Sequence, residues 1–457
     1  MNPKQHAENI VARLRRAGHQ AFLVGGCVRD LLLGREPADF DVSTDATPDQ
    51  VMAIFPETYA VGVQFGVVLV PQSGEEDTHN HQHGSVVEVA TFRSDIGYSD
   101  GRHPDEVRFS SDPRQDVLRR DFTINGLLFD PVTNQVLDFV NGRNDLEARI
   151  IRTIGDPERR FAEDKLRMLR AVRFSSRFDY AIEPATFQAI QKLASQVHQV
   201  SRERVRDELT KILTEGHARS AFLLLDRTGL LHELLPEIEA MKGVSQPPEF
   251  HPEGDVFVHT LLLLQHLPQP CSPTLAWGAL LHDVGKPPTF RIAPDRIRFD
   301  EHVEVGVKMS EEICQRMRFS NEDTAQILAL VDNHMRFADA QGMKDSTFKK
   351  FVRMPHFEEH LELHRIDCLA SHGDLSLYDF TREKLADMPA SVVRPAPLIT
   401  GDDLIGAGYK PGPRFKDILS AVEDGQLEGR FHTKDQVMDF VAHEFPVSES
   451  SDAERSC

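Results

Sequence analysis

Cysteine, tryptophan and tyrosine are scarce in this chain of 457 residues, which contains five cysteines, one tryptophan and five tyrosines. The cysteines are odd in number and scattered, so they provide neither a disulfide framework nor metal-ligand spacing, which is typical of a reducing cytoplasm. No apolar run approaches the roughly 20 residues of a membrane helix, and the polar N-terminus has no signal-peptide core. We therefore expect a soluble, cytoplasmic protein without a membrane partner, whose 40% hydrophobic content forms ordinary cores in about three domains.

Positive charge is also in deficit, because 52 lysines and arginines face 72 aspartates and glutamates and leave a formal net charge of −20. Broad affinity for nucleic acid needs clustered basic side chains on phosphates, so this balance excludes it. It also disfavours a noncatalytic RNA-binding protein. An RNA site must be local, and arginines do crowd between residues 143 and 219 while acids dominate the C-terminal third.

A pair of carboxylates gives the first chemical signal. Asp39 and Asp41 flank Phe40, and side chains alternate faces along an extended strand, so both acids point the same way. Hard oxygen ligands of this kind suit magnesium, which shares its shell with substrate phosphates. The alternative interpretation is plain solvated charge.

A glycine turn precedes these acids. The apolar run from Ala21 to Val24 is strand-like, and Gly25 and Gly26 let the backbone turn before a helix begins. Unpaired N–H groups at such a turn bind anions, and Arg29 adds positive charge, although Gly-Gly is often only a turn. Phosphate and metal carboxylates are predicted to meet here.

These motifs, Gly25-Gly26-Cys27-Val28-Arg29-Asp30 followed by Asp39-Phe40-Asp41, resemble those of the nucleotidyltransferase class that holds bacterial CCA-adding tRNA nucleotidyltransferases and poly(A) polymerases. The resemblance implies an α+β protein. Its N-terminal α/β head would contain a mixed or antiparallel sheet, and an all-α body would follow.

Glu88 is the expected third metal carboxylate. It interrupts the apolar run from Val86 to Phe92, and a lone charge in a buried strand is costly unless it is paired or metal-bound. The resembling family also has an acid in the matching strand. The next stretch, Arg93 to Pro104, has too many turn residues for regular structure and is predicted to form a mobile loop, which in the family sits over the active site.

Three alternating histidines, His79, His81 and His83, offer a further candidate metal site. They lie in an acidic, glycine-bounded segment without a hydrophobic anchor. A solvated hairpin insertion is the stronger interpretation.

Arg120, Asp121 and Asn125 form a candidate nucleotide site. Helical spacing places Asp121 and Asn125 one turn apart, with Phe122 and Ile124 facing elsewhere. An arginine, a carboxylate and an amide together can bind triphosphate and ribose hydroxyls, whereas the simpler alternative is a charged helix start. The run Arg-Arg-Asp-Phe-Thr-x-Asn matches the family motif.

Base selection is expected on a helix from Ala162 to Phe174, where Asp164 pairs with Arg167 at one-turn spacing and Arg170 lies one turn further on. A carboxylate accepts from the exocyclic amine of C or A and a guanidinium donates to the adjacent ring acceptor, whereas G and U present a carbonyl there. The alternative is an exposed helix with weak salt bridges. The resemblance implies that Asp164 and Arg167 read the base.

A second charged helix start, Ser201 to Leu209, also matches a family motif. Its Glu203, Arg204 and Glu208 have a structural alternative, because they would brace the preceding helix. Neighbouring arginines would meet phosphates of the RNA.

A different constellation follows residue 251. His259, the adjacent pair His282-Asp283 and Asp367 show a spacing suited to metal binding, and Gly285-Lys286-Pro287 ends the helix that carries the pair. This pattern resembles the HD phosphohydrolase domain and implies a divalent transition metal there. His302 and His334 lie between these elements.

The sequence thus predicts five segments: 1–145, the nucleotidyltransferase head; 146–245, a helical neck and body for nucleotide selection and RNA binding; 246–376, the HD domain; 377–447, a helical tRNA-binding module; and 448–457, a disordered tail.

The expected reaction adds C and A from CTP and ATP to the 3′ end of tRNA, with Asp39, Asp41 and Glu88 holding two Mg²⁺ ions. Alternatives are a poly(A) polymerase, a CC-adding or A-adding variant, and an HD phosphohydrolase with a nucleotide-sensing head. The stretch from Tyr59 to Val68 resembles the apolar Val-Gly-x-x-Phe-Gly strand of CCA-adding enzymes and favours the first of these activities.

Overall fold

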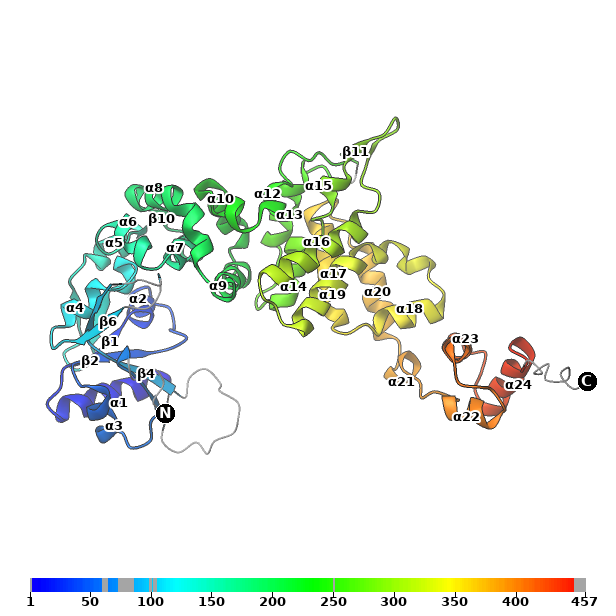
Figure 1. The fold of residues 1–457 in the computed structure, drawn as a ribbon, viewed down its shortest axis with the longest axis horizontal. Coiled ribbons are helices and arrows are strands. Elements are labelled where there is room, and N and C mark those ends of the chain that lie inside the picture. The colour runs from blue at the N-terminus through cyan, green and yellow to red at the C-terminus, as the bar shows by residue number, and fades with distance from the viewer. Residues whose placement is uncertain are drawn as a thin grey trace, which may run out of the picture. The chain divides into compact units, whose positions relative to one another are not determined.

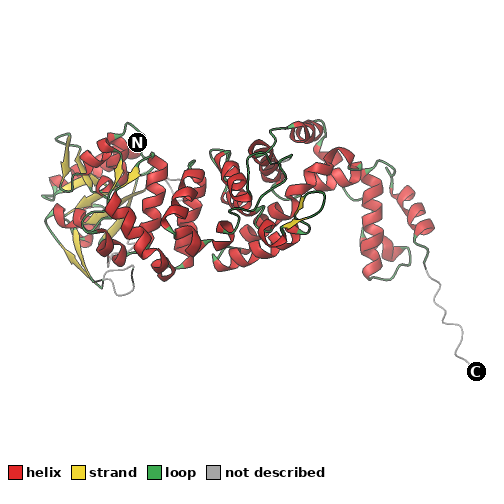
Figure 2. Ribbon diagram, turned by 90° about the horizontal axis from the view of Figure 1, so that it is seen from above, coloured by secondary structure: helices red, strands yellow, loops and turns green. Residues whose placement is uncertain are grey.

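The computed structural model describes residues 2–59, 65–72, 86–97, 101, 105–249 and 251–447. The chain forms two compact units: Met1–Ala240 with Pro268–Cys271 and Gln315–Arg318, and Met241–Leu267 with Ser272–Cys314 and Phe319–Cys457. Strands concentrate in the N-terminal part and helices make up the rest, which confirms the predicted α+β class (Figure 2). Among the described helices, none is long and apolar enough to cross a membrane. The division into five segments stays a prediction.

A six-stranded mixed sheet forms the centre of the head, which we define as the part from α1 to β8 (Figure 1). Its strand order is β3-β4-β2-β1-β7-β8, and only β2 and β4 pair in parallel. The strands are β1 (Ala21–Val24), β2 (Asp41–Thr44), β3 (Val67–Pro71), β4 (Val86–Thr91), β7 (Leu127–Asp130) and β8 (Gln135–Asp138).

The register of this sheet separates an apolar face from a charged one. Asp41 and Glu88 are cross-strand partners, and the next pair along the same strands, Val42 and Val89, is fully buried on the opposite face. Helix α1 (Pro3–Arg16) covers the valine face and buries residues at helical spacing, including Ile10. The other head helices are α2 (Gly26–Leu32), α3 (Pro48–Ile54) and α4 (Pro113–Leu118).

The stretch after β4 differs from the predicted irregular loop. Arg93–Ile96 forms β5 and pairs antiparallel with β6, Glu106–Phe109, which begins after the predicted loop. The prediction is therefore wrong for the first four residues of the stretch from Arg93 to Pro104, which form a regular strand. Residues 60–64, which include Val61 and Gly62, and the histidines at 79, 81 and 83 lie outside the described residues, as does the predicted tail.

Helices make up most of the remainder of the first unit. They are α5 (Gly142–Ala148), α6 (Pro157–Glu163), α7 (Leu166–Phe178), α8 (Pro184–Leu193), α9 (Arg202–Thr214), α10 (Ala218–Thr228), α11 (Leu230–Leu234) and α12 (Pro236–Glu239), with the short parallel strands β9 (Ile150–Ile151) and β10 (Ala181–Ile182). The expected single helix from Ala162 to Phe174 is wrong, because the backbone at Asp164 is extended, with φ −149° and ψ 107°, and separates α6 from α7.

The second unit is built from helices around the fully buried Trp277. Its larger helices are α13 (Val256–Gln265), α14 (Pro273–Leu281), α16 (His302–Arg316), α17 (Asn321–Asn333), α18 (Asp345–Val352), α19 (Phe357–Ala370) and α20 (Ser376–Ala386). Smaller elements are α15 (Lys286–Thr289), α21 (Ala390–Val393), β11 (Arg291–Ile292) and β12 (Ile297–Arg298). At its C-terminal end α22 (Gly401–Gly406), α23 (Pro413–Leu427) and α24 (Lys434–Glu444) share a small core that includes Leu404, Ile418 and Val437.

Candidate active site and metal cluster

Three carboxylates gather where β2 and β4 run side by side. Asp41 begins β2 opposite Glu88 of β4, and Asp39 lies two residues before Asp41, beyond the strand, with Phe40 buried between them. Burial raises the pKa of Asp41 to about 7, and the negative charges of Glu88 and Asp39 contribute to this rise. Carboxylates that repel one another in this way fit a divalent cation, which would relieve the repulsion.

Glu88 differs from its prediction in one respect. The prediction assumed a buried charge, but the side chain is exposed, whereas Val87 and Val89 on either side of it are buried. Alternation along β4 sends Glu88 to the open face of the sheet, so the strand carries no desolvation penalty at this position. Its nearness to Asp41 follows from strand pairing.

The glycine turn lies beside these acids. Gly25 has φ +78°, a conformation that L side chains rarely adopt, and a Cβ built there would lie 3.1 Å from the Arg120 guanidinium. Arg120 therefore reaches the turn that begins α2.

Arg29 borders the same turn but is bound to protein groups. Its Nη2 lies 3.5 Å from the position of a Cβ on Gly26. The guanidinium is buried, however, and donates to Asp30 at 2.9 Å and to the Asn125 side-chain oxygen at 2.6 Å. A direct contact of Arg29 with phosphate stays a prediction.

Asp121 and Asn125 meet without the helix that was predicted to join them. Helix α4 ends at Leu118, and a short 3-10 helix spans Thr123–Asn125. Phe122 and Ile124 are both fully buried, and the chain turns here to bring both side chains into the core. Asn125 Nδ2 still donates to Asp121 Oδ1 at 3.1 Å, so the two side chains lie together although the predicted helix is absent, and their role in nucleotide binding stays a prediction.

A third group fixes Asp121 from the other side. Arg170 of α7 contacts Asp121 Oδ2 at 2.7 Å. Burial opposes ionisation of Asp121, but the Arg170 charge and the Asn125 hydrogen bond outweigh it and lower the pKa to about 2. Asp121 is thus an ionised, oriented acceptor.

Asp164 and Arg167 are close in sequence but do not pair, which corrects the prediction. Asp164 is bound by Arg204 of α9, with Nη2 to Oδ2 at 2.7 Å and Nη1 to Oδ1 at 3.2 Å. Arg167 contacts Glu163 at 2.9 Å. The extended backbone at Asp164 removes the helical register on which the predicted pair depended. For Arg204, sequence reasoning weighed a family motif against a bracing role and did not predict a contact with Asp164.

The bracing interpretation is confirmed for Glu208. This buried carboxylate accepts from Arg173 Nε at 2.5 Å and so connects α9 to α7. Arg173 also donates to Glu215 at 3.1 Å. These contacts hold the helix that carries Arg167 and Arg170.

The second unit contains a separate cluster of candidate metal ligands. His259 Nε2 lies 3.1 Å from Asp367 Oδ1 and 3.3 Å from His282 Nε2, and the ligand atoms of these three residues all lie within 4.8 Å of one another. Asp283 forms a similar group with His302 and His334. Within the described ranges, groups this tight occur only in the second unit, since the head carboxylates are more widely spaced.

Backbone carbonyls orient several of these imidazoles. The Nδ1 atoms of His282, His302 and His334 donate to the carbonyl oxygens of Ala279, Phe299 and Val331 at 2.8, 2.9 and 2.6 Å. Each Nε2 atom then carries a lone pair that is directed at the cluster. Those of His302 and His334 are buried without a hydrogen-bond partner in the described part of the chain, and this donor set fits a transition metal ion.

Two carboxylates support His259. Glu253 Oε1 lies 2.7 Å from its Nδ1, and Asp367 approaches its Nε2. Burial disfavours the imidazolium, yet these carboxylates raise the pKa of His259 to about 9. Sequence reasoning noted His302 and His334 without assigning them and missed Glu253, which lies before α13 with no motif to mark it.

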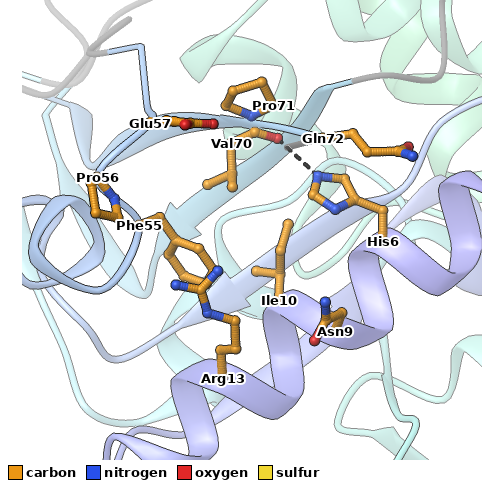
Figure 3. A pocket seen from close by; sticks show the side chains of 10 residues that line it. All are labelled: His6, Asn9, Ile10, Arg13, Phe55, Pro56, Glu57, Val70, Pro71 and Gln72. Atoms are coloured by element: carbon orange, nitrogen blue, oxygen red, sulfur yellow. Dashed lines mark hydrogen bonds between the residues drawn. The ribbon is translucent and has the colours of Figure 1, made fainter. Parts of the chain in front are cut away.

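One pocket of about 390 Å³ lies on the α1 side of the head. Figure 3 shows His6 bonded to the Val70 carbonyl and Arg13 beside Phe55, with Ile10 between them. Val70 points away from the face that carries Glu88, since Leu69 is the cross-strand partner of Glu88. No residue that lines this pocket was predicted as a site residue.

Comparison with known proteins defines the class. Residues 21–152 match the poly A polymerase head domain, residues 179–242 match the probable RNA- and SrmB-binding site of polymerase A, and residues 256–370 match the HD domain. The first match contains the glycine turn, Arg120 and the three carboxylates of Asp39, Asp41 and Glu88, which we call the carboxylate face. The chain is thus a nucleotidyltransferase-type head followed by a helical body with an HD domain.

The relatives narrow this class. A CCA-adding enzyme of Geobacillus stearothermophilus is 43% identical over 228 residues, which cover 50% of this chain and 54% of the relative. One of Lactobacillus helveticus is 38% identical over 258 residues, 56% of this chain and 62% of the relative. The chain thus matches somewhat more than half the length of these curated relatives.

Solved structures extend the match in space. The CCA-adding enzyme of Bacillus stearothermophilus in complex with CTP has a TM-score of 0.73 and 27% identity, and covers 96% of this chain and 98% of its own. The Thermotoga maritima enzyme complexed with tRNA, with a TM-score of 0.56, 18% identity and coverage of 97% and 96%, shows the fold alone. In its head, RNA-binding and HD matches and in these relatives, the chain is similar to bacterial CCA-adding enzymes and poly(A) polymerases with an HD domain.

Proposed function

We propose that this protein adds C and A from CTP and ATP to the 3′ end of tRNA and so builds or repairs the CCA sequence. The observation that carries the proposal is the carboxylate face of Asp39, Asp41 and Glu88 beside the Gly25 turn that Arg120 reaches. The names of the relatives and the CTP complex of the similar structure support the same activity.

Divalent metal is implied by the family, and Mg²⁺ is the ion that these oxygen donors suit. The three carboxylates that would hold two Mg²⁺ ions are those of Asp39, Asp41 and Glu88. When bound, Mg²⁺ would stabilise the charge of the phosphates and lower the pKa of the attacking 3′-hydroxyl. The mutual repulsion that contributes to the raised pKa of Asp41 supports this assignment.

The chain's own side chains would bind and orient the nucleotide. Arg120 and the Gly25-Gly26 turn would hold the triphosphate, with the N–H groups of the turn as donors. Asp121 and Asn125 would accept from and donate to the ribose hydroxyls. Arg29 would act indirectly in this scheme, because it holds the Asn125 side-chain oxygen.

Base selection would use Asp164, with Arg167 as the neighbouring donor. Arg204 occupies both Asp164 oxygens, yet each carboxylate oxygen has two lone pairs, so an acceptor site remains for the exocyclic amine of C or A. A carbonyl of G or U at that place would face a carboxylate and be repelled. Arg170 would support the pocket through Asp121.

The body would hold the RNA. We assign residues 1–145 to the head, 146–245 to nucleotide selection and RNA binding, 246–376 to the HD domain and 377–447 to a tRNA-binding module. The arginine-rich α7 and α9 support the second assignment, since phosphate contacts require clustered basic side chains.

A second activity is favoured by the histidine cluster. His259, His282, Asp283 and Asp367 would hold a divalent transition metal, and the buried Nε2 atoms of His302 and His334 extend the donor set. A metal ion in this setting would supply Lewis acidity for hydrolysis of a phosphate ester.

Incorporation assays test the proposed function. Purified protein is incubated with Mg²⁺, each labelled nucleoside triphosphate in turn, and either tRNA lacking its 3′ end or an unrelated RNA of equal length. The proposal predicts labelling of tRNA by CTP, and by ATP once CTP is present, with UTP and GTP excluded. Release of phosphate without any labelling of tRNA would instead indicate an HD phosphohydrolase with a nucleotide-sensing head.

A further inference from the structure

Asp116 in the first turn of α4 is a fully buried carboxylate that no expected function uses. Its two oxygens are divided between consecutive arginines. Oδ1 accepts from Arg119 Nε at 2.9 Å and Oδ2 accepts from Arg120 Nη2 at 3.0 Å. Burial opposes its ionisation, but the two guanidinium charges outweigh burial and lower its pKa. An ionised, fully buried carboxylate therefore anchors the guanidinium groups of both arginines.

The Arg120 arm leads to the candidate active site. Arg120 Nε and Nη2 donate hydrogen bonds to Asp116, while Arg120 Nη1 lies 3.1 Å from the position of a Cβ on Gly25. The same guanidinium charge lowers the pKa of Asp41, although burial and the neighbouring acids raise it overall. One edge of Arg120 is thus anchored while its other edge faces the turn and the acids.

The Arg119 arm leads to the β5–β6 hairpin. Arg119 Nη1 lies 3.8 Å from Oδ2 of Asp95 on β5, and Asp95 also pairs with Arg93 at 3.0 Å. The Arg119 carbonyl accepts from Arg160 and Arg167. Through Arg119 and Arg120, Asp116 is therefore connected to the hairpin, to the glycine turn at Gly25 and to the helices next to the expected base readers.

We propose that Asp116 is a positioning residue that aims Arg120 at the triphosphate and, through Arg119, ties the β5–β6 hairpin to the same site. The inference rests on the proposed function, because it assumes that nucleotide binds at the Gly25 turn. An unanchored arginine samples many rotamers, and fixing it on binding costs free energy that Asp116 has already offset. The effect is expected on nucleotide affinity and not on base choice.

Substitution Asp116→Asn tests the first half. Asn keeps the size of the side chain but cannot neutralise two guanidinium groups. We expect the Kd of CTP and of ATP, measured by equilibrium binding without tRNA, to rise about tenfold, which corresponds to about 1.4 kcal/mol. KM should rise in parallel, while kcat and the preference among the four nucleotides should each change by less than about threefold.

The matched control is Asp130→Asn. Asp130 is also a buried carboxylate in the head and pairs with Arg15 at 2.9 Å, at the end of β7 away from the turn. It should lower thermal stability without a change in Kd. Equal loss of nucleotide affinity in both variants, or wild-type affinity in Asp116→Asn, would overturn the proposal.

A double substitution separates positioning from general destabilisation. In an Arg120→Gln background, Asp116→Asn should cause no further loss of CTP affinity, because its effect acts through Arg120. Additive losses would contradict the proposal. The double variant also leaves fewer unpaired buried charges, so it remains informative where Asp116→Asn alone does not fold.

The second half is tested by hydrogen exchange of the hairpin. Arg119→Gln should increase amide exchange in residues 93–96 and 106–109, whereas Arg120→Gln should leave it at the wild-type rate. Equal exchange in both variants would show that Arg119 does not connect the β5–β6 hairpin to Asp116. If the wild type transfers no nucleotide to tRNA while Asp116→Asn still weakens CTP binding, only the proposed function fails; normal transfer with unaltered binding in Asp116→Asn defeats only the inference.

Discussion

At the scale of single residues, the account depends on carboxylates whose charge is either opposed or held in place. Asp41 is half-buried beside Glu88 and Asp39, and desolvation together with their charges raises its pKa to about 7, whereas Asp121 is ionised beside Arg170 and has a pKa of about 2. Opposite shifts in one head indicate different roles. A cation would relieve the repulsion at Asp41, whereas Asp121 is already ionised and oriented by protein groups.

Loss of Asp41 should abolish nucleotide incorporation. We expect Asp41→Asn, and likewise Asp39→Asn, to reduce the rate at saturating Mg²⁺ by at least about 100-fold, because charge stabilisation at the phosphates is lost. Asp45→Asn is the control, since Asp45 follows β2 and contacts His19 and Gln20. Circular dichroism should show an unchanged fold, and near-normal incorporation in either active-site variant would show that the metal assignment is wrong.

The raised pKa of Asp41 makes a pH prediction for the metal-free protein. The folded state binds this proton more tightly than the unfolded state, so the contribution to stability is present below about pH 4 and is lost as the pH rises through about 7. With chelator, the free energy of unfolding of Asp41→Asn relative to wild type should therefore increase between pH 5 and pH 8. The increase is at most about 1.4 kcal/mol for each tenfold difference in proton affinity between the folded and unfolded states. A difference that does not vary with pH would contradict the assigned charge repulsion.

At the scale of elements, strand pairing and one helix break build the site. Pairing of β2 with β4 sets Asp41 opposite Glu88, and the extended residue Asp164 between α6 and α7 turns its carboxylate toward α9. The alternation that places both strand acids on one face can be predicted from sequence. The partner of Asp164 cannot, because Arg204 lies 40 residues away and only tertiary packing brings it near.

Arg204→Gln should relax the choice among nucleotides. Without its guanidinium, Asp164 loses the contacts that fix its orientation, so discrimination between C or A and G or U should fall by about tenfold, equivalent to one charge-assisted hydrogen bond. The comparison is of kcat/KM for all four triphosphates. Arg202→Gln on the same helix, which contacts His198, is the matched control. A uniform loss of rate with unchanged selectivity would return Arg204 to the role of a brace.

Several other elements show why local patterns predict only part of the structure. The strands β1 and β4 match the apolar runs that predicted them, Ala21 to Val24 and Val86 to Phe92. The pairing of β5 with β6 was missed, because turn residues between two strands conceal their non-local hydrogen bonds. The end of α4 at Leu118 was missed as well, since burial of both Phe122 and Ile124 is decided by the tertiary core.

At the scale of the whole molecule, two sites lie in two compact units. The head and its neighbouring helices contain the carboxylate face, and the second unit contains the histidine cluster. The motif His282-Asp283 indicated the second site from sequence. The contributions of His302 and His334 became visible only through their buried Nε2 atoms.

His282→Ala should separate the two activities. We expect it to lower the transition-metal content of the purified protein and to abolish metal-dependent phosphatase or cyclic phosphodiesterase activity, because a central imidazole ligand is removed. Nucleotide addition to tRNA should stay within about twofold of wild type, as expected for a change in a different compact unit from the head. His432→Ala in the C-terminal module, where the residue is exposed, is the control. Simultaneous loss of both activities would mean that the two sites act as one functional unit.

The most direct test of the account is the product ladder on three tRNA substrates that end before, within and after the CCA sequence. With CTP, ATP and Mg²⁺, the account predicts that the first two are extended to a CCA end, that extension then stops, and that the third is not extended. A long ladder of A residues on any of the three would contradict it and identify a poly(A) polymerase, and a stop after two C residues or addition of A alone would identify a split activity.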